Sequence, residues 1–155
     1  MVLFMMTVLI GFVSGLRTMT APAAISIAAY MGWLKLADSW AAFLAHWLAV
    51  AIFVVLALVE FVTDQLPGTP SRTVPQQFGA RILSGAFCGA VIGTIGGSLV
   101  LGLIAGVMGS VLGTLGGYEG RKRLVAAIGG KDLPIAILED AIAVLLALWV
   151  VTSFS

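Results

Sequence analysis

Residues 82–118 read ILSGAFCGAVIGTIGGSLVLGLIAGVMGSVLGTLGGY, and this stretch decides the fold class. It holds 37 consecutive residues without Asp, Glu, Lys, Arg or His, whereas one helical crossing of a bilayer needs about 20 apolar residues. One straight helix cannot use the whole stretch. The cluster Gly96-Gly97-Ser98, the densest group of weak helix formers near its middle, predicts a turn between two helices.

The composition of the whole chain agrees with a membrane environment. Of its 155 residues, 61% are hydrophobic and 10% are charged, whereas roughly 25% of the residues of an ordinary soluble domain are charged. A water-soluble fold of this size could not cover so much apolar surface. The formal net charge of +1 gives no field that would attract nucleic acid. We therefore expect a single membrane domain over residues 1–155, in the bacterial cytoplasmic (inner) membrane.

Charges and helix breakers define three further hydrophobic segments, 1–34, 39–62 and 134–151. The second and third have the length of single spans. The first is interrupted at residues 17–22, RTMTAP, where a charge, two hydroxyls and a proline at a plausible helix start predict a break between two short helices. The opening residues lack the pattern of a cleaved secretory signal, so we expect them in the mature structure.

The order of the segments suggests that one plan is used twice. Each half, 1–66 and 81–155, reads as a broken or re-entrant hairpin of two short helices followed by one longer helix, and residues 67–80 connect the halves. Three elements per half imply inverted repeats, as in many small transporters. The prediction rests on hydropathy alone. It leaves open whether 1–34 and 82–118 cross fully or re-enter, and on which side the N-terminus lies.

Basic residues predict the orientation. Six of the eight Lys and Arg lie in the connections 65–81 and 119–132. The positive-inside bias makes these two loops cytoplasmic and places the C-terminus outside. Three of the basic residues are expected to meet anionic lipid headgroups: Arg121, Lys122 and Arg123.

Glycines recur at every fourth position in the long apolar stretch, a spacing that places each set on one helix face. The two sets are Gly85, Gly89, Gly93 and Gly97, and Gly109, Gly113 and Gly117. Smooth faces of this kind predict close helix packing. The alternatives are that they line a ligand path or a moving interface.

Four acidic residues lie within or at the ends of the two single-span segments, where ionisable groups need an explanation. Glu60 and Asp64 share one helix face at a helix end that is unfavourable to negative charge, so they need partners, protons or a cation. Glu139 and Asp140 follow Pro134 at a favourable helix start. With Arg81, all four could form one charged site near the cytoplasmic face. The alternative is a structural ion-pair network that ties the two halves together.

Arg17 follows sixteen uncharged residues and sits beside the predicted helix break, close to Thr18 and Thr20. A guanidinium group, hydroxyls and the free amides of a helix start could hold a phosphate or carboxylate. The alternatives are an arginine that reaches the membrane interface or that pairs with an acid from another segment.

Catalysis has little support in the sequence. One histidine, His46, and one cysteine, Cys88, cannot supply a metal cluster or a familiar nucleophile and base pair. We expect no enzymatic activity and no cofactor, and the sequence leaves a metal open.

Three short motifs carry a resemblance to a known family: Gly15-Leu16-Arg17, Leu58-Val59-Glu60 followed by Asp64-Gln65-Leu66-Pro67, and Leu138-Glu139-Asp140. In this order they resemble domain-of-unknown-function family 4126, which comprises small bacterial integral membrane proteins. The chain departs from the family pattern at Gln65, where a lysine is common, and this leaves Asp64 without a neighbouring counter-charge. The resemblance implies a membrane protein and no assigned activity.

The function predicted from the sequence is a small transporter or channel-like carrier of an ion or a small anionic or lipid-phosphate substrate. Its expected path residues are Arg17, Thr18, Thr20, Glu60, Asp64, Arg81, Glu139 and Asp140. The alternative is a structural or regulatory subunit that binds partner helices through its glycine faces. Expected partners are membrane lipids, further copies of the chain in a homo-oligomer, and an ion or anionic lipid as ligand. The cargo cannot be read from the sequence.

Overall fold

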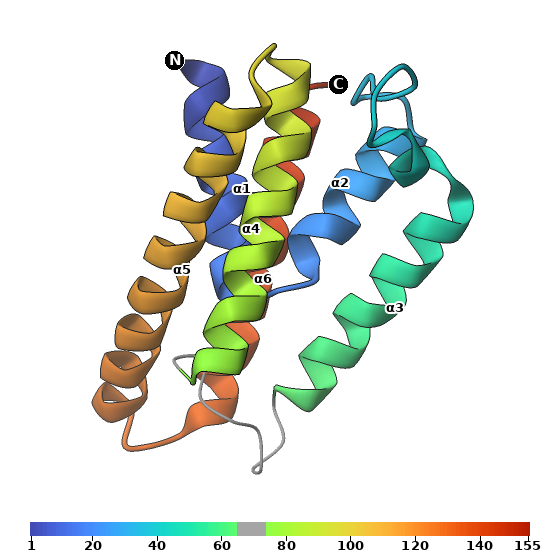
Figure 1. Cartoon of the computed structure of the whole chain (residues 1–155). Helices are drawn as coiled ribbons and strands as arrows, with labels where there is room; N and C mark the ends of the chain where they lie inside the picture. Colours follow the sequence, from blue (N-terminus) through green and yellow to red (C-terminus); the bar gives the residue numbers. More distant parts are fainter. Residues whose placement is uncertain (65–73) are drawn as a thin grey trace.

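The computed structural model describes residues 1–64 and 74–155 and is built from helices (Figure 1). The elements in chain order are α1 (Val2–Leu16), α2 (Thr20–Tyr30), the short 3-10 helix η1 (Ala42–Ala45), α3 (Trp47–Thr63), α4 (Pro75–Ile95), α5 (Leu99–Ala127) and α6 (Asp132–Thr152). No strand occurs in the described part of the chain, which confirms the all-α prediction.

The predicted break in the first segment is confirmed. α1 ends at Leu16 and α2 begins at Thr20, with Arg17 extended between them. α1 has 15 residues and α2 has 11, so at about 1.5 Å per residue neither reaches across a hydrocarbon core of about 30 Å. Their connection lies near mid-height of the bundle, and the hairpin returns to the end from which it started (Figure 1). The hairpin therefore turns back within the bundle.

The predicted turn in residues 82–118 is also confirmed. α4 ends at Ile95, and Gly97 takes the left-handed φ of 85° that a residue with a Cβ rarely adopts. Ser98 then caps α5, because its Oγ accepts a hydrogen bond from the amide of Leu101. The expectation of two short helices is wrong here, since α4 has 21 residues and α5 has 29.

Two boundaries of the predicted loops are also wrong. α4 begins at Pro75, where an N–H would have no partner within the helix, so the missing N–H of proline costs no hydrogen bond. Residues 75–81 are therefore helical, and Arg81 does not lie in a connection. α5 continues through the charged residues 119–127, leaving only 128–131 between α5 and α6. Gln65, Pro67 and Arg72 fall outside the described residues.

The two halves begin at opposite ends of the bundle, but they are not equivalent. The first hairpin turns at mid-height, whereas the second runs the length of the bundle (Figure 1). Both chain termini and the turn at residues 35–38 lie at one end, which we call the terminal end. The end of α3, the start of α4 and residues 128–131 lie at the other, which we call the basic end.

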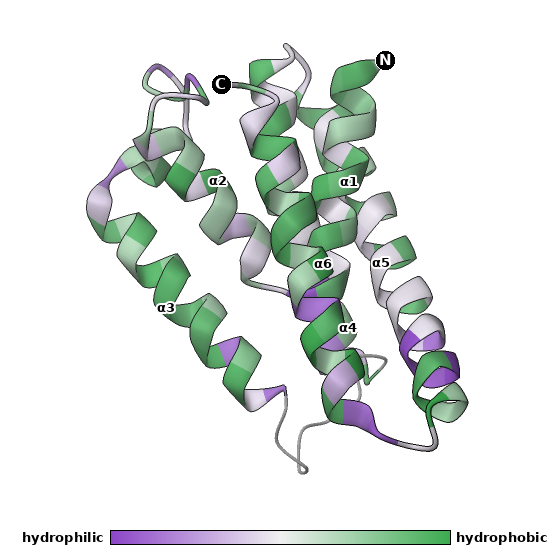
Figure 2. Cartoon of the chain, turned by 180° about the vertical axis from the view of Figure 1, so that it is seen from behind, coloured by the Kyte–Doolittle hydropathy of each residue, from purple (hydrophilic) through white to green (hydrophobic). Residues whose placement is uncertain are grey.

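Three of the described helices are long and apolar enough to cross a membrane: α4, α5 and α6. Large apolar side chains are exposed along them, for example Leu112 on α5 and Leu145 on α6. Hydrophobic residues make up much of α1, α3 and α6 (Figure 2). These features are compatible with a multi-pass membrane protein.

Glycines bring α4 and α5 into backbone contact. A Cβ on Gly89 would lie 2.2 Å from the carbonyl oxygen of Gly102, and a Cβ on Gly106 would lie 2.0 Å from that of Gly85. Gly93 meets Gly102 in the same way. Gly85, Gly89 and Gly93 therefore have the predicted packing role, and their partners Gly102 and Gly106 were not predicted.

The second predicted glycine set packs on α1 instead of α4. A Cβ on Gly109 would lie 2.1 Å from the carbonyl oxygen of Val8, and one on Gly113 would lie 2.2 Å from that of Phe12. Gly97 was wrongly assigned to packing, because it lies in the α4–α5 turn with open space around it. Gly117 lines a cavity among α1, α5 and α6.

α3 stands apart from this body and is inclined to it (Figure 1). Ala57 is buried, whereas the large side chains of α3, such as Ile52 and Val59, are mostly exposed. At its start the ring of His46 accepts a hydrogen bond from the amide of Leu48 and caps the helix. Phe53 and Ala57 pack against the other helices, and polar contacts join the last two turns of α3 to the α1–α2 connection.

Candidate charged site

Arg17 lies in the interior of the bundle, with 1% of its side chain exposed. Its guanidinium group binds Asp140 of α6 through Nε and Nη2, and Nη1 donates to Oδ2 of Asp64 at 3.0 Å. Arg17 thus joins the α1–α2 connection to α6 and to the end of α3. Of the alternatives for this residue, pairing with acids of other segments is the one observed.

Glu60 occupies the helix start that the sequence suggested as an anion site. The backbone amides of Thr18 and Met19 donate to Oε1 and Oε2 of Glu60 at 2.7 and 2.8 Å. These amides lie at the N-terminus of α2, where N–H groups are unpaired within the helix and the dipole favours negative charge. A carboxylate from α3 therefore fills the position that a bound anion would take.

Arg81 is 2% exposed and contacts the other side of the break, the C-terminal end of α1. Its Nη1 donates to the carbonyl oxygens of Gly15 and Leu16 at 2.9 and 2.7 Å, the last carbonyls of α1. Its Nη2 also lies 3.8 Å from Oδ2 of Asp64. The break between α1 and α2 is therefore stabilised by a guanidinium group at its carbonyl side and a carboxylate at its amide side.

Five of the predicted residues thus meet at one place, which we call the core cluster: Arg17, Glu60, Asp64, Arg81 and Asp140. Two guanidinium groups face three carboxylates. Hydrophilic stretches from the α1–α2 connection, α3 and α6 lie between mid-height and the basic end in Figure 2. Of the charges predicted to form one site, Glu60, Asp64, Arg81 and Asp140 meet here together with Arg17, whereas Glu139 does not join them.

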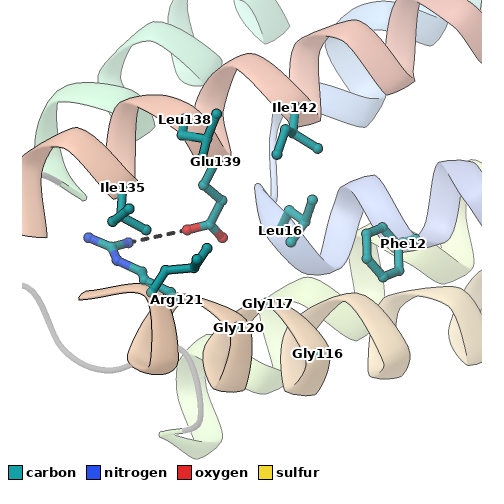
Figure 3. A pocket seen from close by; sticks show the side chains of 11 residues that line it. Phe12, Leu16, Gly116, Gly117, Gly120, Arg121, Ile135, Leu138, Glu139 and Ile142 are labelled. Carbon is teal, nitrogen blue, oxygen red and sulfur yellow. Dashed lines mark hydrogen bonds and ion pairs between the residues drawn. The ribbon is translucent and has the colours of Figure 1, made fainter. Parts of the chain in front are cut away.

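Glu139 lies in a second group, which we call the end cluster. Arg121 of α5 binds Asp132 at 2.6 Å and Glu139 at 3.4 Å, so it ties the end of α5 to the start of α6. Figure 3 shows the pair of Arg121 and Glu139 beside a cavity of about 180 Å³. The other walls of the cavity include Phe12, Leu16 and the α5 glycines 116, 117 and 120. The cavity is apolar apart from the ion pair.

The three basic residues predicted to meet lipid headgroups differ in their surroundings. Arg121 turns inward to the end cluster. Arg123 is exposed and pairs with Glu119 one turn earlier on α5 at 2.9 Å. Lys122 is also exposed. Contact with headgroups stays a prediction, and its geometry now favours Lys122 and Arg123.

The two predicted threonines are both buried. Thr18 contributes backbone: its amide donates to Glu60 and its carbonyl accepts from Ser84 Oγ at 2.6 Å. Thr20 lies at the first position of α2. Its buried hydroxyl has no hydrogen-bond partner among residues 1–64 and 74–155.

Sequence reasoning missed two contributing residues. Ser84 lies one turn after Arg81 on the same face of α4, and that spacing could have indicated it. Asp132 opens α6, where an acidic residue in the first turn is favoured by the helix dipole. The partner of Ser84 is the carbonyl of Thr18, 66 positions away, which the sequence does not indicate.

The described residues contain no group of three or more His, Cys, Asp or Glu side chains arranged to hold a metal ion. Cys88 is fully buried in the apolar core and is not bonded to another cysteine. The chemistry offered by the core cluster is therefore that of guanidinium groups, carboxylates and backbone amides.

The three long apolar helices are compatible with the class of helical, multi-pass membrane proteins. The family model of the domain of unknown function DUF4126 matches residues 4–153, and the chain belongs to this family. A search of curated proteins and a search of solved structures gave no match. The family resemblance drawn from the short motifs is thereby confirmed, and it assigns no activity.

Proposed function

We propose that the protein is a small carrier that moves an anion through the membrane by way of the core cluster. One observation carries the proposal: the carboxylate of Glu60 sits on the amides of Thr18 and Met19, at a helix start inside the bundle. Backbone amides at a helix N-terminus bind phosphate and carboxylate groups in many proteins. Arg17, packed beside them, adds a fork of donors suited to the same ligands.

The proposed mechanism of transport is an exchange between the carboxylates of the protein and an anionic substrate. A substrate phosphate or carboxylate would replace the side chains that now occupy the donors of Arg17 and of the α2 start. Each released carboxylate then loses its contacts inside the membrane, where it gains from binding a proton or reaching water. Entry of the substrate is therefore coupled to protonation of Glu60, Asp64 or Asp140.

α3 is the element suited to move. Most of its large side chains are exposed, and Glu60 and Asp64 join it to the α1–α2 connection. When a substrate displaces these carboxylates, it removes the contacts that hold α3. A ligand that binds one arrangement of α3 better than another shifts the population between them.

A second function is favoured by the same contacts. The core cluster joins four segments, α1–α2, α3, α4 and α6, and this is what a purely structural ion-pair network would do. The idea of partner helices docking on glycines has less support, because Gly89, Gly106 and Gly109 are occupied by the chain's own helices.

Proteoliposomes separate the two functions. We would measure uptake of radiolabelled phosphate, and translocation of a fluorescent phosphatidate, for the native chain, Arg17→Lys and Arg123→Gln. Arg17→Lys keeps the charge and loses the guanidinium fork, so we expect transport to fall about tenfold or more, the effect of one lost charge-assisted hydrogen bond. Arg123 is an exposed arginine in a surface ion pair and serves as the matched control.

The outcomes differ for the two functions. A carrier loses transport in Arg17→Lys while its elution in gel filtration stays native, and Arg123→Gln transports normally. A structural network predicts lower thermal stability and no transport of either probe by any variant. Unchanged transport in Arg17→Lys would refute the proposed carrier mechanism.

Orientation and assembly belong to the same proposal. Lys122, Arg123 and Lys131 lie near the basic end, so the positive-inside bias supports a cytoplasmic basic end and an external terminal end in a bacterial inner membrane. The exposed apolar faces leave room for a homo-oligomer. Chemical labelling of cysteines introduced at Lys131 and Lys35 in intact cells tests the orientation.

A further inference from the structure

The last two carbonyl groups of α1, those of Gly15 and Leu16, lie in the interior of the bundle. Both residues are buried, and the helix ends near mid-height (Figure 1). The last carbonyls of a helix have no amide partner within it, and the negative end of the helix dipole lies at the same place. In transporters with interrupted helices, such carbonyls coordinate a coupling Na⁺.

The guanidinium group of Arg81 occupies this helix end. Its Nη1 lies 2.9 Å from the carbonyl oxygen of Gly15 and 2.7 Å from that of Leu16, and its Nη2 lies 3.8 Å from Oδ2 of Asp64. Carbonyl and carboxylate oxygens are also the ligands that hard metal cations take. Because Arg81 is 2% exposed, its positive charge is held inside the bundle.

The charges of the core cluster favour a cation at this position. The cluster has two guanidinium groups and three carboxylates, so without Arg81 a single guanidinium group would face all three. That group, on Arg17, already divides its donors between Asp64, Asp140 and the Leu16 carbonyl. Carboxylates left without a partner inside the bundle are costly. A second positive charge at the end of α1 therefore stabilises the ionised acids.

We propose that Arg81 is a tethered counter-ion, whose guanidinium group fills a site that would otherwise bind Na⁺ or K⁺. The inference rests on the proposed carrier function and concerns its coupling ion. Because a side chain of the protein fills the site, anion transport does not need a metal cation. A proton on one of the carboxylates is then the coupling ion. Arg81 is thus a positioning residue that determines the ion selectivity of the carrier.

An arginine that only capped α1 would behave differently when it is replaced. Removal of a cap should destabilise the protein equally in every salt. Removal of a tethered counter-ion opens a cation site, so a free cation should replace the lost charge. Arg81→Ala removes the guanidinium group and leaves the two carbonyls and Asp64 in place. Arg81→Lys keeps a tethered positive charge and is the matched control.

The first experiment compares cations at constant ionic strength. The native chain, Arg81→Ala and Arg81→Lys are purified in choline chloride. Their melting temperatures in detergent are then measured in choline chloride, sodium chloride, potassium chloride, or choline chloride with a little guanidinium chloride. A ligand that binds only the folded protein raises the melting temperature with its concentration. We expect guanidinium, and Na⁺ or K⁺, to raise the melting temperature of Arg81→Ala and not that of the other two proteins.

The second experiment measures transport in proteoliposomes, with radiolabelled phosphate and fluorescent phosphatidate as probes. When choline replaces Na⁺ and K⁺, the native rate should stay within about twofold. Arg81→Ala should transport about tenfold or more slowly in choline than in sodium or potassium, the effect of one lost charge-assisted contact. An imposed pH gradient should drive transport by the native chain in all three salts.

The outcomes separate the counter-ion from the carrier. A native chain that needs Na⁺ or K⁺ for transport overturns the tethered counter-ion and leaves the carrier. Equal melting temperatures of Arg81→Ala in all four solutions, or its aggregation in all of them, overturn the counter-ion as well, because an open site would bind a free cation. An equal cation response of Arg81→Lys has the same meaning. If neither probe moves in any salt while Na⁺ or K⁺ stabilises Arg81→Ala, the counter-ion stands and the carrier function fails.

Discussion

α5 and α3 are both apolar helices, yet they are attached to the rest of the molecule by different means. α5 lies against α4 and α1 through glycines that bring backbones together, as at Gly106 and Gly109. α3 exposes most of its large side chains and is held near its end by the carboxylates of Glu60 and Asp64. α5 is held by close backbone packing, and the end of α3 is held by charged contacts.

This difference matters because the two kinds of contact respond to different changes. Lipid tails are as apolar as the side chains, so moving an apolar side chain from lipid to a helix interface lowers its free energy little. Close backbone packing is therefore what holds helices such as α4 and α5 together. Charged contacts inside the membrane are strong only while both partners remain charged and paired. α5 should therefore be static, and α3 should respond to protons and anions.

The largest effect is expected from filling the glycine contact. Gly106→Leu places a side chain where even a Cβ would lie 2.0 Å from the carbonyl oxygen of Gly85. We expect α4 and α5 to separate, with a loss of stability of about 3 kcal/mol or more, as in overpacked cores. Gel filtration of the detergent-solubilised protein should show aggregation.

Gly116→Leu is the matched control for this change. It lies on the same helix with open space at its Cβ, so it should elute as the native protein does. Native elution of Gly106→Leu would contradict the fixed contact between α4 and α5.

The second effect concerns the buried arginine. Arg17→Gln removes the guanidinium group that binds Asp64 and Asp140, and breaking a buried pair in this way costs about 3–5 kcal/mol. Arg123→Gln removes an exposed pair and should change stability by less than about 1 kcal/mol. Thermal unfolding in detergent should separate the two variants, and equal melting temperatures would refute the importance of the core cluster.

The third effect tests the attachment of α3 directly. Glu60→Gln keeps one oxygen acceptor but loses the charge that binds the amides of Thr18 and Met19, at a cost of about 1.5–3 kcal/mol. We expect faster hydrogen exchange in α3 and unchanged exchange in the middle of α5. Glu119→Gln, at an exposed site on α5, is the control. Equal changes in both helices would mean that α3 is not separately held.

The smallest effect is expected at Thr20. Its hydroxyl is buried without a hydrogen-bond partner among the described residues, so Thr20→Val should raise stability by up to about 1 kcal/mol. Ser84→Ala removes the hydrogen bond to the Thr18 carbonyl and should lower stability by about 1 kcal/mol. Opposite shifts in melting temperature are the expected result. A lower melting temperature for Thr20→Val would show that the hydroxyl is satisfied.

Helix breaks and turns could be predicted because they depend on residues that are close together in the sequence. The break at residues 17–19 follows from a charge, two hydroxyls and a proline within six positions, and the turn at 96–98 follows from two glycines and a capping serine. The lengths of α4 and α5 were misjudged, because a charge was taken as the end of a helix. Arg81 shows the error: its charge is accepted inside α4 because the carbonyls of α1 face it.

The sequence alone indicated a membrane protein, the places where its helices break, and the ionisable residues that need partners. These properties depend on composition and on neighbours within a few positions. The tertiary structure decided which partners meet: Arg17 with Asp140, 123 positions away, and Gly106 with Gly85. It also placed Glu60 on the start of α2, since a carboxylate and two amides converge only when separate helices pack.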